Sequence, residues 1–218
     1  VAGSTVNRLC GSGLEAIARA CQAIRCGEAD VQLAGGVEHM HHLPMESQLE
    51  IHPQVFARSS RAALSMGLTA EHLAAEHGIS RDEQEAFALE SHRKAAAVTA
   101  AGLFADEIVP ITVKGRKGDT IVDQDEYIRH GATLESMQKL RPAFTKEGSV
   151  TAGNASGIND GAAGVLVMSA EEAEKRGLTP LARIASYATA GLDPTIMGMG
   201  PVHASRKALA KAGWSVDD

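Results

Sequence analysis

Cys10 is the residue in this sequence whose setting is best suited to covalent chemistry. It stands in Cys10-Gly-Ser-Gly13, at the start of a segment with helical spacing. The free N–H groups and the dipole of a helix N-terminus favour negative charge on a nearby sulfur, and the thiolate is the nucleophilic form of cysteine. The same N–H groups stabilise the oxyanion that forms when a thioester is attacked. The pattern therefore indicates acyl transfer through a covalent intermediate.

An inert structural role for Cys10 is the competing interpretation, because free cysteine usually packs as a small hydrophobic residue. Spacing alone favours that inert role. Cys21 lies in register with Leu14 and Ile17 on an apolar helix face, and Cys26 ends the same helix, so both are predicted to be structural. The 3 cysteines match no zinc-site spacing, which favours free thiols in a reducing compartment.

Three loop histidines suggest a different chemistry, in which His39, His41 or His42 serves as the base for Cys10 in a cysteine hydrolase. Histidine clusters in loops are more often structural, and a metal site would need further ligands that the sequence does not place. The glycine-rich turn 151–157 suits a phosphate, although a plain tight turn is favoured there. These alternatives stay open but are disfavoured.

The composition is typical of a soluble globular protein, with 218 residues of which 44% are hydrophobic and 22% charged. The net charge is -6 and the basic residues are scattered, so nucleic acid is not expected as a partner. No apolar run approaches the roughly 20 residues that cross a bilayer. We therefore expect a globular protein with neither a nucleic-acid surface nor a membrane span.

The elements that must position Cys10 are a helix and neighbouring strands. Apolar residues recur at helical spacing from Gly11 to Arg25, and Gly27 follows where a C-terminal cap belongs. Residues 31–34 are predicted to form a short strand that ends at the glycine pair 35–36. Together with the segment 4–6, this strand suggests a βαβ unit.

The stretch 39–149 differs in character, with histidines, prolines and charged residues between helical pieces, and is predicted to be an inserted subdomain. Ser80 and Glu83 have the spacing of a capping box, and helix-forming residues follow as far as Gly102. Residues 111–113 and 120–122 are predicted to form a hairpin with a charged tip. Later elements are predicted as a buried strand at 163–168, a helix at 170–176, a strand at 181–188 and a helix at 204–212.

Five segments of the chain resemble thiolase motifs and occur in thiolase order. Val6-Asn-Arg-Leu-Cys-Gly-Ser-Gly13 closely resembles the nucleophile motif, with Cys10 as the acylated cysteine. The others are Gly35-Gly-Val-Glu-His-Met40, Arg141-Pro-Ala-Phe144, Val150-Thr-Ala-Gly-Asn-Ala-Ser-Gly157 followed by Asn159-Asp-Gly-Ala162, and Met197-Gly-Met-Gly-Pro201. One such motif would be weak evidence, but five in order have a negligible chance origin.

The resemblance implies the α/β thiolase fold, a layered mixed sheet with helices and an inserted loop subdomain, of which only part is present. It implies that residues 1–38 and 150–178 belong to the N-terminal thiolase domain. Residues 39–149 would form the loop domain that covers coenzyme A, and residues 179–218 would begin the C-terminal domain.

The resemblance also implies the site residues. Cys10 would be the nucleophile that forms the acyl thioester and lends its backbone N–H to an oxyanion hole. The positions that match coenzyme-A contacts are Met66, Arg129, Ser136, Ala152, Ser156, Gly157 and Met197. Arg129 would meet the nucleotide part of the coenzyme, unless it makes an ordinary surface ion pair. Coenzyme A is implied as a substrate, and no metal or permanently bound cofactor is implied.

The implied activity is thiolytic cleavage of 3-ketoacyl-CoA in fatty acid β-oxidation, or condensation of acetyl-CoA to acetoacetyl-CoA. The family's Gly-His-Pro, Cys-x-Gly and Asn-Glu-Ala-Phe motifs do not occur in these 218 residues. We therefore expect an internal segment that is inactive alone, with a non-catalytic coenzyme-A-binding or assembly fragment as the alternative. A homodimer or homotetramer is implied for the intact protein. A bacterial cytoplasmic location is expected, with mitochondrial or peroxisomal locations left open.

Overall fold

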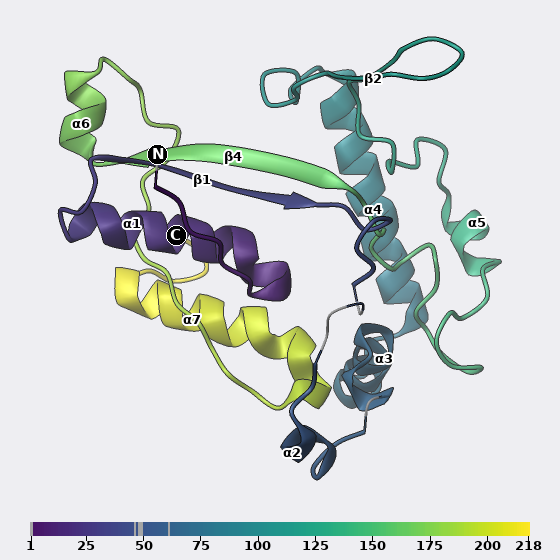
Figure 1. The fold of residues 1–218 in the computed structure, drawn as a ribbon. Helices are drawn as coiled ribbons and strands as arrows, with labels where there is room; N and C mark the ends of the chain where they lie inside the picture. Colours follow the sequence, from purple (N-terminus) through teal and green to yellow (C-terminus); the bar gives the residue numbers. More distant parts are fainter. Residues whose placement is uncertain (1, 46, 48–49, 61) are drawn as a thin grey trace. The chain divides into compact units, whose positions relative to one another are not determined.

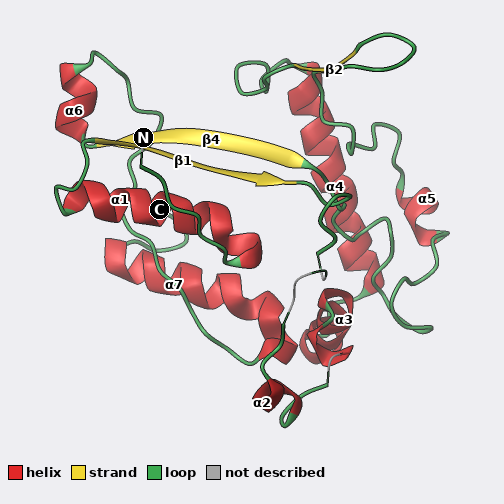
Figure 2. Cartoon of the chain, viewed as in Figure 1, coloured by secondary structure: helices red, strands yellow, loops and turns green. Residues whose placement is uncertain are grey.

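The computed structural model describes residues 2–45, 47, 50–60 and 62–218, which form two compact units (Figures 1 and 2). The unit that we call the sheet unit contains the residues up to Ile51 together with Ile158–Gly191 and Gly200–Asp218. The unit that we call the helical unit contains His52–Gly157 and Leu192–Met199. The chain therefore passes between the units several times, and each unit is built from segments that are distant in sequence.

The sheet unit is a two-stranded antiparallel sheet with helices. Strand β1 pairs with β4 in a register that joins Val31 to Met168 and Glu38 to Gly161, and α1 packs along both strands (Figure 2). Its elements are η1 (Leu9–Gly11), α1 (Ser12–Arg25), β1 (Val31–Glu38), β4 (Gly161–Met168), α6 (Ala170–Lys175) and α7 (Gly200–Ala212). The helix predicted from Gly11 is thus confirmed to within one residue.

Strand β1 does not end at the glycine pair, as the sequence predicted, but continues to Glu38. Gly35 lies opposite Gly164 and Gly36 lies opposite Ala163 in the ladder. A Cβ on Gly35 would stand 2.9 Å from the carbonyl oxygen of Ala163, so the strands approach closely at this point. The glycines are therefore part of the strand and permit a close backbone approach.

Two predicted strands are absent from the described residues, and a third is less buried than predicted. The segments 4–6 and 181–188 have no ladder partner there, and a strand without a neighbour cannot pair its backbone groups. The βαβ prediction is therefore wrong for this structure. Strand β4 forms as predicted, but Val165 is 45% and Leu166 64% exposed, so the prediction of full burial is also wrong.

The helical unit is organised around two long helices. The short helices η2 and η3 contact α3, and α5 contacts α4. The predicted hairpin is confirmed, with Ile111 paired to Val122. The elements are α2 (Pro53–Phe56), η2 (Ala62–Leu64), α3 (Met66–His77), α4 (Arg81–Ala100), β2 (Ile111–Val113), β3 (Thr120–Val122), α5 (Leu134–Gln138) and η3 (Pro194–Met199).

An ion pair at the start of α4 anchors α5. Arg81 Nε lies 2.6 Å from Glu85 Oε1, and the Glu85 side chain is fully buried. Arg81 Nη2 donates to the carbonyl oxygens of Gln138 at 3.2 Å and Leu140 at 2.6 Å, at the end of α5. The guanidinium therefore satisfies one oxygen of a buried carboxylate together with carbonyl groups that the helix itself leaves free, while Glu85 Oε2 has no hydrogen-bond partner among the described residues.

The capping box at the start of α4 is confirmed, and its removal is expected to destabilise the protein. The N–H of Glu83 donates to Ser80 Oγ at 3.2 Å, and the N–H of Ser80 donates to Glu83 Oε2 at 2.7 Å. We expect Ser80→Ala to lower the free energy of unfolding by about 1 kcal/mol, measured by urea unfolding. Ser65 is the matched control because it precedes α3 without a side-chain capping bond. Equal effects of Ser80→Ala and Ser65→Ala would contradict the capping role.

No helix in the described ranges is long and apolar enough to cross a membrane.

Candidate active site

Cys10 lies in a strained turn directly before α1. It is the middle residue of η1, and Leu9 is the one non-glycine residue of the described chain with a positive φ, at 48°. Ser12 Oγ accepts the N–H of Arg8 at 2.8 Å and donates to the carbonyl oxygen of Leu9 at 2.7 Å. Asn7 Oδ1 accepts the N–H of Leu9 at 2.9 Å. Side chains on both sides therefore hold the turn.

Strain of this kind costs about 1–3 kcal/mol and is commonly found at functional sites. Cys10 itself is exposed as a free thiol, and Cys26 is also exposed, while Cys21 is half-buried on α1. The structural role predicted for Cys21 fits its helix face. An exposed cysteine in a turn that hydrogen bonds hold against strain is not an inert core residue, so the geometry favours the chemical interpretation of Cys10.

Two of the three loop histidines, His39 and His41, lie near Asp160, which precedes β4. Asp160 Oδ1 accepts the N–H of Met40 at 2.8 Å, and Asp160 Oδ2 lies 3.4 Å from His39 Nδ1 and 4.0 Å from His41 Nδ1. In the described part of the chain His39 and His41 interact with Asp160, and the ring of His42 lies 5.5 Å from that of His39 between centroids; none of the three forms a hydrogen bond with Cys10. The contacts with Asp160 tie the end of β1 to the start of β4, and nothing in the contacts of the histidines favours the cysteine hydrolase.

The seven predicted coenzyme-A residues all lie in the helical unit, whereas Cys10 lies in the sheet unit. Met66 is the first residue of α3 and is 51% exposed. Met197 lies in η3, which packs on α3. The helical unit therefore holds Met66 and Met197 on elements that contact each other.

The turn 151–157 is closed by its own hydrogen bonds. Asn154 Oδ1 accepts the N–H of Thr151 at 2.8 Å, and Asn154 Nδ2 donates to the carbonyl oxygen of Ser149 at 2.9 Å. Thr151 is fully buried. Ala152 and Ser156 are exposed on this turn, and Gly157 is half-buried. The turn thus exposes the small side chains of Ala152 and Ser156 to solvent, while hydrogen bonds of Asn154 hold its backbone.

Arg129 stands in an aromatic cluster. Its guanidinium carbon lies 5.8 Å from the centre of the Tyr127 ring, and its backbone N–H donates to His92 Nδ1 at 3.3 Å. Tyr127 in turn donates its hydroxyl to the carbonyl oxygen of Ala155 at 3.2 Å. Arg129 has no carboxylate partner among the described residues, so the ion-pair alternative gains no support. The cluster joins Arg129 to the turn 151–157 through Tyr127.

Ser136 is engaged within its own helix. Its Oγ donates to the carbonyl oxygen of Thr133 at 2.7 Å and accepts the N–H of Thr133 at 3.1 Å, in a capping box at the start of α5. The Arg81 and Glu85 pair holds the other end of α5. Ser136 is therefore held at the start of a helix whose other end is also anchored by hydrogen bonds.

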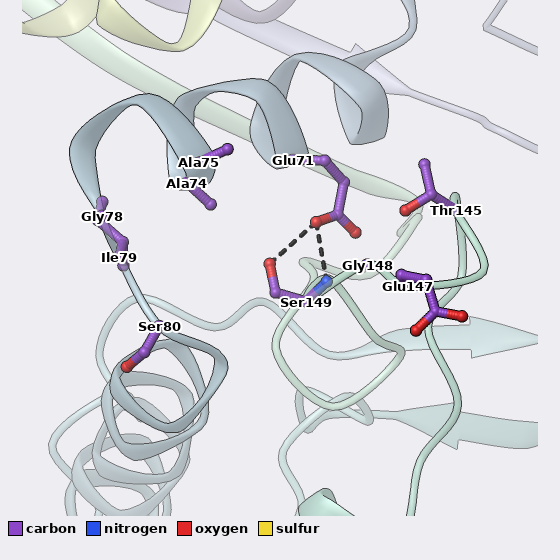
Figure 3. A pocket seen from close by; sticks show the side chains of 10 residues that line it. All are labelled: Glu71, Ala74, Ala75, Gly78, Ile79, Ser80, Thr145, Glu147, Gly148 and Ser149. Atoms are coloured by element: carbon purple, nitrogen blue, oxygen red, sulfur yellow. Dashed lines mark hydrogen bonds between the residues drawn. The ribbon is translucent and has the colours of Figure 1, made fainter.

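An open pocket of about 450 Å³ in the helical unit contains none of these predicted residues (Figure 3). Its walls are the end of α3, Gly78 to Ser80 and the segment 145–149. Glu71 points from α3 toward Ser149 in this pocket and forms hydrogen bonds with it (Figure 3). Sequence reasoning missed Glu71, because a lone glutamate within a helix is normally taken as a solvated residue.

A model of the thiolase N-terminal domain matches residues 1–171 and a model of the thiolase C-terminal domain matches residues 178–218. The chain therefore belongs to the thiolase family, and its structure is a part of the thiolase fold.

The relatives that the chain resembles agree with this assignment. It is 56% identical to an acetyl-CoA acetyltransferase of Paracoccus denitrificans over 225 residues, which cover 98% of this chain and 58% of that protein. It is 51% identical to a 3-ketoacyl-CoA thiolase of Marinobacter nauticus, over 100% of this chain and 56% of that protein. The human mitochondrial 3-ketoacyl-CoA thiolase superposes with a TM-score of 0.86 at 43% identity, over 98% of this chain and 57% of that one. The chain thus spans little more than half the length of these relatives.

Proposed function

We propose that this chain is the part of a coenzyme-A-dependent acyltransferase that carries its nucleophile, Cys10. The observation that supports this most directly is the turn around Cys10, which holds an exposed thiol next to the strained residue Leu9. The names of the relatives, acetyl-CoA acetyltransferase and 3-ketoacyl-CoA thiolase, indicate the reaction class. The substrates proposed are acyl-CoA thioesters.

In the proposed reaction the sulfur of Cys10 attacks the thioester carbonyl. The carbon–sulfur bond to coenzyme A then breaks, coenzyme A leaves with the proton lost by Cys10, and the acyl group remains on Cys10. In condensation, the carbanion of a second acetyl-CoA takes the acyl group from Cys10. In the thiolytic direction, the sulfur of Cys10 attacks the 3-keto carbonyl of 3-ketoacyl-CoA instead, the bond between C2 and C3 breaks, acetyl-CoA leaves as a carbanion that takes up a proton, and coenzyme A then takes the acyl group from Cys10. The backbone N–H of Cys10 is proposed to donate to the oxyanion that forms in each addition.

The proposed binding residues lie in the helical unit. Arg129, placed against Tyr127, suits the nucleotide part of coenzyme A, because a guanidinium binds phosphate through paired donors. Ala152, Ser156 and Gly157 suit the thin pantetheine arm, because their small side chains leave the backbone accessible. Met66 and Met197 are proposed at the acyl and pantetheine end, with Ser136 beside the coenzyme.

The test compares the complete protein with the isolated 218-residue chain after each is mixed with acetyl-CoA. In the complete protein we expect an acetyl adduct on the peptide that contains Cys10, detected by mass spectrometry. In the isolated chain we expect turnover at least about 10³-fold lower, since the motifs that supply the family's acid–base groups do not occur in its sequence. An acyl adduct elsewhere in the complete protein would contradict the role of Cys10, and equal turnover would contradict the need for those motifs.

A non-catalytic coenzyme-A-binding or assembly fragment is the second candidate. It is favoured by one observation, that all seven proposed coenzyme-A residues belong to the helical unit and none to the unit with Cys10. Binding of coenzyme A by the isolated chain, without acyl transfer by the complete protein, would support this candidate. Homo-oligomeric assembly, participation in β-oxidation and a cytoplasmic location stay predictions.

A further inference from the structure

Helix α3 carries one of the proposed coenzyme-A residues and contacts two segments that carry or lead to others. Met66 is its own first residue. Leu73 packs against Gly198 in η3, where a Cβ on the glycine would stand 2.8 Å from Leu73 Cδ1. Between these positions, Glu71 contacts the segment that leads into the turn 151–157. The helix is therefore placed to fix the parts of the helical unit that are proposed to meet the coenzyme.

The contact of Glu71 with that segment consists of three hydrogen bonds. Glu71 Oε2 accepts the backbone N–H of Ser149 at 2.8 Å and its hydroxyl at 2.9 Å, while Oε1 accepts the N–H of Val150 at 2.9 Å. Figure 3 shows the carboxylate directed from α3 at Ser149. Gln84, from α4, donates to the same hydroxyl at 2.9 Å. Both oxygens of the carboxylate are thus committed to two consecutive residues.

The backbone lies close to this carboxylate because Gly148 has no side chain. A Cβ at Gly148 would collide with the carboxylate of Glu71 and with the hydroxyl of Thr145. Burial raises the pKa of Glu71, but the hydrogen bonds from Ser149 and Val150 outweigh it and leave the pKa below its usual value. Glu71 is therefore an anion at neutral pH, and bonds to an anion are stronger than those between neutral groups.

The hydrogen bonds that begin at Glu71 continue into the turn 151–157. Ser149, whose N–H and hydroxyl are held by Glu71, also accepts the side-chain N–H of Asn154 with its carbonyl oxygen. Asn154 in turn accepts the N–H of Thr151, and Val150 is only 7% exposed. A continuous series of hydrogen bonds therefore runs from α3 to the base of the turn that presents Ala152 and Ser156.

We propose that Glu71 is a positioning residue for coenzyme A, whose carboxylate fixes residues 149–150 and thereby holds the turn 151–157 in its binding shape before the coenzyme arrives. This inference rests on the proposed function. Its physical basis is preorganisation: a turn that is already ordered loses less conformational entropy when a ligand binds. Glu71 acts through the turn and does not itself touch the substrate.

The chain offers a matched control in Glu147, which lines the same pocket and has the same charge. Glu147 is exposed, and its carboxylate points away from Ser149 in Figure 3. A change of net charge near the pocket is therefore common to Glu71→Gln and Glu147→Gln. Only Glu71→Gln removes the anion that accepts hydrogen bonds from Ser149 and Val150. It also places an N–H₂ group, which is itself a donor, opposite those N–H donors.

The experiment uses the complete protein and two readouts. The dissociation constant of coenzyme A is measured by calorimetry, and hydrogen exchange of the peptide 149–157 is followed by mass spectrometry. We expect Glu71→Gln to weaken coenzyme A binding about tenfold, as for charge-assisted bonds that are lost, and to speed exchange in the peptide. Glu147→Gln is expected to match the wild type in both readouts.

A milder variant covers the case in which Glu71→Gln fails to fold. Ser149→Ala removes the hydroxyl bond and keeps both backbone bonds, so we expect weakening of about two- to threefold with moderately faster exchange. Wild-type values for Ser149→Ala and for any folded Glu71→Gln would overturn the proposal. So would exchange that speeds equally across the whole helical unit, because that result marks a purely structural role.

The same data separate this inference from the proposed function. If the wild-type protein binds coenzyme A and transfers acyl groups while Glu71→Gln leaves both readouts unchanged, only the positioning role fails. If the wild type binds coenzyme A without acyl transfer, and Glu71→Gln weakens binding, the positioning role stands and the acyltransferase fails. A wild type that does not bind coenzyme A overturns both.

Discussion

Replacing Cys10 with serine is expected to lower acyl transfer by the complete protein by at least about 10³-fold, because the hydroxyl is a far weaker nucleophile than the thiol. Serine is close to cysteine in size, and the bonds that hold the turn come from Asn7 and Ser12. The turn should therefore remain folded in this variant. The measurement is kcat with an acyl-CoA substrate, together with the loss of the acyl adduct at position 10.

Cys21→Ser and Cys26→Ser are the controls for that experiment. Cys26 is exposed, as Cys10 is, but it follows the end of α1, whereas Cys10 precedes the start. Both control variants are expected to keep kcat within about twofold of the wild type, since neither residue is proposed to contact the substrate. A Cys10→Ser protein with near wild-type kcat would show that another residue carries the acyl group.

Removing the charge of Arg81 is expected to have the largest effect on stability. In Arg81→Met the side chain of Glu85 would remain fully buried without its cation, and the carbonyl groups of Gln138 and Leu140 would lose their donor. Breaking one side of a buried pair usually costs about 3–5 kcal/mol, because an uncompensated charge stays in the interior. We expect a loss of about 3 kcal/mol in the free energy of unfolding, measured with urea.

Lys139 and Glu135 provide the matched control, because their ion pair has the same 2.6 Å separation and the same helical spacing. The difference is exposure, which is 72% and 80% for these side chains and 27% and 0% for Arg81 and Glu85. Lys139→Met should therefore change the free energy of unfolding by less than about 0.5 kcal/mol. If both variants lose the same stability, burial is not the cause of the effect at Arg81.

The local elements were predictable from the sequence because their signals are local. The helix ending before Gly27, the capping box of Ser80 and Glu83, and the charged hairpin 111–122 all depend on residues close together in the chain. Each is confirmed within a few residues. Periodicity and capping chemistry report the energetics of a single element, and these were sufficient here.

The errors have one physical origin, which is pairing between distant segments. Strand β1 continues through Gly35 because Gly164 lies opposite, and nothing near position 35 in the sequence shows that. The apolar segment 181–188 has the composition of a strand but finds no partner among the described residues. The burial of β4 was predicted from its hydrophobic residues alone, but the exposure of a strand depends on which other segments pack against its two faces.

The candidate site shows the same division. The motif around Cys10 was readable from the sequence, and the family that it implied is confirmed by the domain matches. The contacts of Glu71 with Ser149 and of Arg81 with Leu140 join segments far apart in the chain, and no local sequence pattern predicted these contacts. The seven coenzyme-A positions came from the resemblance and stay predictions.

The way the chain alternates between its two units has a consequence for the order in which the protein folds on the ribosome. The two strands of the sheet unit lie on opposite sides, in sequence, of the segment His52–Gly157. Strand β1 leaves the ribosome early, yet its partner β4 is made only after that whole segment. Closing so large a loop is entropically slow, whereas α3 and α4 form from neighbouring residues. We therefore expect much of the helical unit to be structured during synthesis before the backbone groups of β1 that pair with β4 have their partner.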